Sequence, residues 1–136
     1  MVNSRYLEII EHTSEGFKPC IDYGEWRVAI LRYISDVDVK NIKSLERHLE
    51  TDEVFVLLEG NCTLLIGEGR EIVSSIHKIE MSPLKLYNVK KGTYHNHILS
   101  KDARVLIVEN RNTSERNSEI IPLSVEQQHQ IRSIAG

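Results

Sequence analysis

Short apolar runs separated by turn residues recur along the chain at intervals of roughly ten residues. Residues 54–58 and 62–66 are apolar and are joined by Glu59-Gly60-Asn61, a combination typical of a tight turn, which predicts a β-hairpin over residues 54–66. Short strands at this spacing are typical of an all-β sandwich or barrel. The other expected strands are at residues 26–33, 72–81, 84–89, 95–99 and 105–109.

The C-terminal part of the chain follows a different pattern. Ser124 precedes Gln127 by three positions, which is the arrangement of a helix N-cap with a capping box. We therefore expect a short terminal helix over residues 124–134, preceded by a polar surface loop at residues 110–118. No linker, repeat or charge block divides the chain, so we expect one domain over residues 1–136, with its barrel core at about residues 25–110.

The segment 54–58 is apolar on both faces, and a strand of that kind needs cover on both sides. The barrel interior would cover one side. Either the N-terminal strand or a second subunit would cover the other. A homodimer is therefore one expectation from the pattern.

Composition excludes several classes of protein. The chain has 136 residues, 40% of them hydrophobic, which is enough for a core, and a net charge of -3 argues against a nucleic-acid binder. No segment approaches the ~20 apolar residues of a membrane span, and residues 1–12 lack the apolar stretch of a secretory signal. The two cysteines, Cys20 and Cys62, are expected to be free thiols in a reducing compartment, so we expect a cytoplasmic protein.

Histidines and carboxylates gather in two separate segments. Glu46 and His48 are two residues apart and would share one face of a strand, and Glu53 opens the next strand after a polar turn. His95 and His97 are two apart on a later strand. If these strands line one barrel, Glu46, His48, Glu53 and His95 converge inside it. Each residue taken alone would be an ordinary surface or hydrogen-bonded group, so the hypothesis rests on the agreement between the segments.

Such a set of imidazoles and carboxylates suits Zn, Fe, Mn, Ni or Co, between which the sequence does not distinguish. Open positions on the metal would make the site reactive rather than purely structural. A Gly-rich phosphate loop and a Gly-x-Ser-x-Gly elbow are both missing from the sequence.

Two segments resemble the motifs of the cupin superfamily, an all-β family with a jelly-roll barrel. Residues 46–60 resemble the first motif, with His48 at its second histidine, Glu53 at its glutamate and Gly60 at its closing glycine; Glu46 stands where the first histidine is usual. Residues 90–97 resemble the second motif, with its glycine and its metal-binding histidine at Gly92 and His95.

The resemblance implies a divalent metal held by His48, Glu53 and His95, with Glu46 as a fourth ligand or as a catalytic base beside His95. It also implies that the barrel binds or acts on a small polar metabolite of the carboxylate type. Tyr94 and His97 are candidates for orienting that substrate, although His97 can equally be a hydrogen-bonded core residue.

A second, patchier resemblance is to ureidoglycolate lyase, a member of the same superfold that releases urea and glyoxylate. It rests on residues 45–48, the strand at 53–58, the Tyr94-His95 step and residues 117–119. In that alternative Glu46, His48 and His95 would share the acid and base tasks of an elimination. A third alternative is a non-catalytic small-molecule-binding or structural cupin. A metal-dependent lyase, isomerase or oxygenase all remain open at this point.

Overall fold

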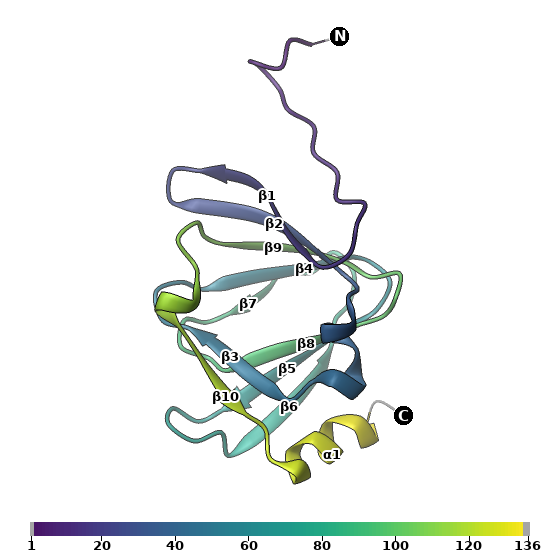
Figure 1. Cartoon of the computed structure of the whole chain (residues 1–136), viewed down its shortest axis with the longest axis vertical. Helices are drawn as coiled ribbons and strands as arrows, with labels where there is room; N and C mark the ends of the chain where they lie inside the picture. Colours follow the sequence, from purple (N-terminus) through teal and green to yellow (C-terminus); the bar gives the residue numbers. More distant parts are fainter. Residues whose placement is uncertain (1, 135–136) are drawn as a thin grey trace.

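The computed structural model describes residues 2–134, which fold into two five-stranded antiparallel sheets and a short terminal helix (Figure 1). The first sheet has the strand order β1-β2-β9-β4-β7 and the second has the order β10-β3-β8-β5-β6. The strands are β1 (Phe17–Tyr23), β2 (Trp26–Arg32), β3 (Ser44–His48), β4 (Glu53–Glu59), β5 (Cys62–Glu68), β6 (Ser75–Glu80), β7 (Tyr87–Val89), β8 (His95–Leu99), β9 (Arg104–Asn110) and β10 (Ser118–Pro122), followed by helix α1 (Val125–Ile134).

The core between the sheets is built by strict alternation along the strands. In β4, Phe55 and Leu57 point inward and are fully buried, and Val105 and Ile107 do the same in β9. Burying side chains of this size stabilises the fold by roughly 1.5–3 kcal/mol each. Glu53 lies on the same side of β4 as Phe55 and Leu57. The alternation that builds the core therefore also places one carboxylate in the interior.

A second apolar cluster lies on the outer side of the second sheet. Leu45, Leu65 and Tyr94 contribute to it from the sheet side, and Ile131 of α1 is buried against it. The Ser124 hydroxyl accepts a hydrogen bond from the Gln127 amide at 3.0 Å, and the Gln127 side chain accepts one from the Ser124 amide at 2.9 Å. The capping box predicted for this helix is therefore confirmed.

The prediction of a β-hairpin over residues 54–66 is wrong. The strands β4 and β5 belong to different sheets, with β4 paired to β9 and β5 paired to β8. Gly60, with φ of 74°, turns the chain from one sheet to the other and packs directly on the backbone of Ala103, where β8 crosses to β9. A turn between two sheets and a hairpin turn use the same residue types. Which of the two forms depends on the strands later in the chain with which β4 and β5 pair.

Three further elements differ from the sequence expectation. The strands β1 and β10 lie outside the predicted set, and the predicted polar loop contains a 3₁₀ turn, η3 (Glu115–Asn117). That turn is capped by Ser114, whose hydroxyl accepts from the Arg116 amide. Over residues 2–134, no helix combines the length and the apolar character that crossing a membrane requires.

Candidate metal centre

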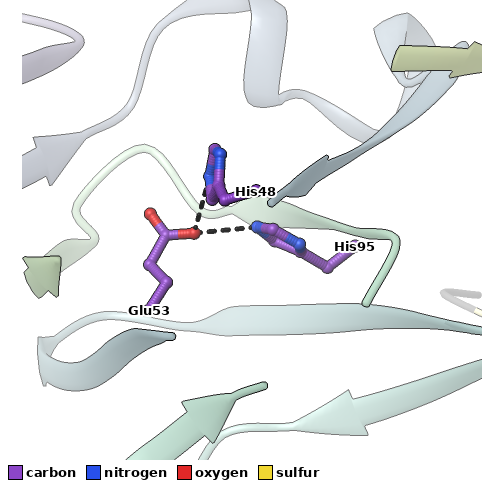
Figure 2. A group of neighbouring side chains, drawn as sticks. All are labelled: His48, Glu53 and His95. Carbon is purple, nitrogen blue, oxygen red and sulfur yellow. Dashed lines mark hydrogen bonds and ion pairs between the residues drawn. The ribbon is translucent and has the colours of Figure 1, made fainter. Parts of the chain in front are cut away.

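Two histidines and one glutamate meet where three strands begin or end (Figure 2). His48 is the last residue of β3, Glu53 is the first of β4, and His95 is the first of β8. All three are buried, and one ligand atom from each lies within 4.8 Å of the others. Because they come from both sheets, the sandwich itself brings the three groups together.

Both imidazoles are directed at the same carboxylate oxygen. The Nε2 atom of His95 lies 2.8 Å from Oε1 of Glu53, and Nε2 of His48 lies 3.2 Å from that oxygen (Figure 2). The far nitrogens are held as well. Nδ1 of His95 donates to the Thr93 carbonyl at 2.9 Å, and Nδ1 of His48 lies 2.8 Å from the Ser118 hydroxyl. The bond to Thr93 requires a proton on Nδ1 of His95, so Nε2 is the nitrogen that would bind a metal, in place of its hydrogen bond to Glu53.

The electrostatics of the cluster favour an ionised carboxylate. Burial alone would raise the pKa of Glu53, but hydrogen bonds from His48 and His95 hold that pKa well below its usual range. Burial also lowers the pKa of His48, and the Glu53 carboxylate more than compensates, so this pKa lies above its ordinary value. The Glu53 carboxylate therefore supplies a negative charge at the point on which both imidazoles converge.

The donor set fits a divalent cation. Ligand atoms that share one ion at about 2.1 Å lie roughly 3.0–3.5 Å apart, and the two measured separations, 2.8 and 3.2 Å, are close to that range. Nitrogen and carboxylate oxygen together suit a first-row metal or zinc. Three protein ligands would leave positions on the ion open toward the adjacent cavity.

A cavity of about 320 Å³ opens beside the three residues. Glu46 lines it from β3, directly opposite His95 in the strand register, but its carboxylate does not join the three converging donors. Thr113, Ser114 and Glu115 line it as well, so the segment predicted as a plain surface loop contributes to the cavity wall.

Two charged residues of the cavity were missed in the sequence analysis. Glu109 of β9 is buried beside Glu53, and its carboxylate lies 3.5 Å from the Arg27 guanidinium of β2. Burial, then the neighbouring Glu53 charge, raises the pKa of Glu109 to about 8. The signal was present in the sequence, because Glu109 has the same parity as the core residues Val105 and Ile107.

The structure separates the two residues expected to orient a substrate. His97 lines the cavity and packs against Phe55, with 5.7 Å between ring centroids; burial lowers its pKa to about 4, and its Nδ1 has no hydrogen-bond partner among the described residues. Tyr94 has the opposite parity and lies in the apolar cluster outside the second sheet, away from the cavity. Its position does not support the predicted substrate contact.

Arg47 also points outward, as its parity predicts. Its Nε donates to Glu119 at 2.8 Å, and its guanidinium lies 4.6 Å from the centre of the Tyr94 ring. Arg47 therefore forms an ion pair with Glu119 outside the barrel and does not reach the cavity.

Several solved structures share this architecture. A cupin-2 domain protein from Shewanella frigidimarina is similar to the chain with 18% identity and a TM-score of 0.51, covering 81% of this chain and 94% of that one. Pac13, a nucleoside dehydratase, is similar with 7% identity and a TM-score of 0.57, covering 85% and 87%. The capsular polysaccharide assembling protein CapF from Staphylococcus aureus is similar with 17% identity and a TM-score of 0.58, covering 86% of this chain and 34% of that one.

Neither a family model nor a curated protein matches the sequence. The structural similarities establish the fold, and the chain is a cupin-fold protein with one jelly-roll of two sheets and a terminal helix. The cupin resemblance of residues 46–60 and 90–97 is confirmed at the level of the fold, and these segments bring His48, Glu53 and His95 to one point.

Proposed function

We propose that this protein holds a divalent metal with His48, Glu53 and His95, and binds or acts on a small polar metabolite in the adjacent cavity. The observation that carries the proposal is the convergence of two imidazole nitrogens on one ionised, buried carboxylate oxygen. When bound, the metal would polarise a carbonyl or carboxylate of the ligand and lower the pKa of bound water.

The cavity favours a small ligand with polar groups. Its volume of about 320 Å³ is at the lower end of the range for small-molecule sites. Arg27 supplies a cation, Glu46 and Glu109 supply carboxyl groups, and Ser118 supplies a hydroxyl. Pac13 has a similar fold, and a variant of the Streptomyces protein has been solved with uridine, which supports the use of such a barrel for a small polar metabolite.

Metal content of protein purified without a histidine tag tests the first part of the proposal. We expect close to one divalent ion per chain in the parent, and little or none in His48→Ala and His95→Ala, because each removes one of three ligands. His129→Ala is the matched control, since His129 is exposed on α1. A parent that takes up no ion from any of the five candidate metals, or variants that retain it fully, would refute the metal site.

Glu46 is proposed as the base rather than as a fourth ligand, because it faces the cavity without joining the converging donors. Glu46→Gln should therefore keep its metal and lose turnover of any substrate found. Loss of metal in Glu46→Gln would instead make Glu46 a ligand. His95 would combine metal binding with its predicted catalytic role, and His97 would contact the ligand from the cavity wall.

The ureidoglycolate lyase alternative is favoured by one observation, the Arg27 guanidinium in the cavity, which can receive a substrate carboxylate. Release of urea from ureidoglycolate by the parent, lost in Glu46→Gln, would support it. Metal binding without turnover of this or other polar substrates would favour the binding-protein alternative. A cytoplasmic location and the absence of nucleic-acid partners stay predictions.

A further inference from the structure

The four-residue turn between β3 and β4 carries two carboxylates and joins two of the three proposed metal ligands. His48 ends β3 and Glu53 begins β4, so the turn at residues 49–52 connects them directly along the chain. The third ligand, His95, follows a separate turn at residues 90–94, between β7 and β8. The geometry of the three donors therefore depends on how these two turns are held together.

Pairing between strands gives the two imidazoles little mutual support. Within the part of the chain that the structure describes, β3 pairs with β8 at one register position, Glu46 opposite His95, whereas β8 pairs with β5 at five. A side-chain bond from Asn96 to the Ser44 carbonyl, at 2.9 Å, supports the opposite end of β3. The position of His95 relative to His48 therefore depends on contacts outside the strand ladder.

Asp52 binds the second turn with both oxygens of its carboxylate. Oδ1 accepts a hydrogen bond from the Lys91 amide at 2.8 Å, and Oδ2 accepts one from the Asn88 side chain at 3.1 Å. The next amide of the same turn, that of Gly92, donates to the His48 carbonyl at 2.8 Å. Two successive amides of the second turn are therefore bonded to the segment that carries the other two ligands.

The other carboxylate of the first turn is bonded in a different direction. Oε1 of Glu50 accepts from the side chains of Asn112 and Asn117 at 3.3 and 3.4 Å, on either side of the turn that lines the cavity. Glu50 and Asp52 are both exposed, have the same charge and lie two residues apart. Of the two, Asp52 is bonded to the turn that leads to His95.

We propose that Asp52 is a positioning residue of the metal centre. Its carboxylate fixes the turn at residues 90–94 against the segment at residues 48–53, and so holds His95 in place beside the other two ligands. The inference rests on the proposed metal site. Metal–ligand distances vary by only about 0.2 Å between sites, so a small gain in freedom at His95 lowers the affinity for the ion.

The zinc affinity of the purified protein, measured by competition with a chelator, tests this role. Groups that orient metal ligands typically contribute about 10- to 100-fold to metal affinity. Asp52 acts through the backbone rather than on an imidazole, so Asp52→Ala should raise the dissociation constant for Zn²⁺ about tenfold, the lower end of that range. Because Asp52 is exposed, this substitution leaves no void in the core.

Glu50→Ala is the matched control for Asp52→Ala. It removes the same charge from the same turn, and it breaks bonds to the cavity wall rather than to the turn at residues 90–94. We expect Glu50→Ala to bind Zn²⁺ as tightly as the parent. Circular dichroism and thermal melting establish that each variant is folded.

Asp52→Asn separates the hydrogen bond from the charge. Its amide side chain keeps an oxygen that can accept from the Lys91 amide and loses the negative charge. Asp52→Asn should therefore restore most of the Zn²⁺ affinity that Asp52→Ala loses. Equal losses in the two variants would show that Asp52 attracts the cation through its charge, and that result would overturn the positioning role.

NMR of the metal-free protein gives a readout that requires no metal. In the parent the Lys91 and Gly92 amides should exchange slowly with solvent, because both are hydrogen-bonded. Asp52→Ala should speed exchange at both amides and shift the imidazole ¹⁵N resonances of His95. Glu50→Ala should leave those resonances unchanged, and a loss of overall stability alone would not move them.

The proposal is overturned if folded Asp52→Ala binds Zn²⁺ as tightly as the parent, or if Glu50→Ala loses as much affinity as Asp52→Ala. A parent that binds no metal refutes the proposed metal site instead. In that case the NMR comparison still decides whether Asp52 positions His95, and unchanged His95 resonances in Asp52→Ala overturn the proposal.

Discussion

Gly60 and Gly92 occupy the glycine positions of the two cupin-like segments, and replacing each by alanine should have different consequences. Both glycines have left-handed backbones, with φ of 74° and 81°. A Cβ atom on Gly92 would meet nothing within 4 Å. A Cβ atom on Gly60 would lie 2.6 Å from Cα of Ala103 and 2.7 Å from its amide nitrogen. Both variants therefore place an alanine in a left-handed backbone, and only Gly60→Ala also creates a steric clash.

The shared cost is the left-handed conformation of an L-residue, about 1–2 kcal/mol. Carbon atoms in ordinary contact are about 3.5–4.0 Å apart, so Gly60→Ala must also push two backbone corners apart by about 1 Å. Overpacking of that kind costs about 1–3 kcal/mol. We expect a loss of about 1 kcal/mol for Gly92→Ala and about 3 kcal/mol for Gly60→Ala, a difference of about 2 kcal/mol.

Urea and thermal unfolding of the metal-free proteins measure both losses, since bound metal would shift the midpoints by mass action. For a chain of this length the difference corresponds to roughly 6–10 °C in Tm. Equal losses in the two variants, or a larger loss for Gly92→Ala, would refute the idea that the Gly60–Ala103 approach locks the corner between the sheets.

Two other predictions follow from buried titratable groups. The raised pKa of Glu109, about 8 against an ordinary value near 4.5, means that this group favours the folded state fully below about pH 4.5 and loses that contribution as pH rises through about 8. In urea unfolding of metal-free protein, the stability of Glu109→Gln relative to the parent should therefore increase as pH rises from about 5 to about 9. A stability difference between the two proteins that does not change with pH would contradict the assigned pKa. Burial raises the pKa of the Cys62 thiol to about 12, so alkylation of the native protein near pH 8 should modify Cys20 alone, and denaturation should expose both. Rapid labelling of Cys62 in the folded chain would contradict its burial.

The sequence was a good guide wherever local patterns decide the outcome. Short apolar runs bounded by turn residues located the central strands, and the Ser124-to-Gln127 spacing located the helix start, because both depend on neighbours within a few residues. The turn at Glu59-Gly60-Asn61 was recognised, but its partner strands were not. Which sheet receives β5 is decided by β8, about thirty residues later, and no local signal carries that information.

Only part of the candidate site was predicted from the sequence. His48, Glu53 and His95 were expected together and lie together. Glu109 and Arg27 were overlooked, although each has the parity of core residues in its own strand. A charge at an inward position is a sequence signal for a cavity, because burying it without a polar site would be too costly. Tyr94 was predicted to contact the substrate because it precedes His95 in the sequence. Adjacent residues of a strand point to opposite faces, so Tyr94 lies in the apolar cluster outside the second sheet.

The two ends of the barrel have separate tasks. Gly60 and Ala103 close one end, where the chain crosses between the sheets. Thr113, Ser114 and Glu115 stand at the other end, on a surface turn that the core strands do not need for their pairing. Under the proposed function, exchanging residues 113–115 would change which ligands fit the cavity and leave the core strands in place.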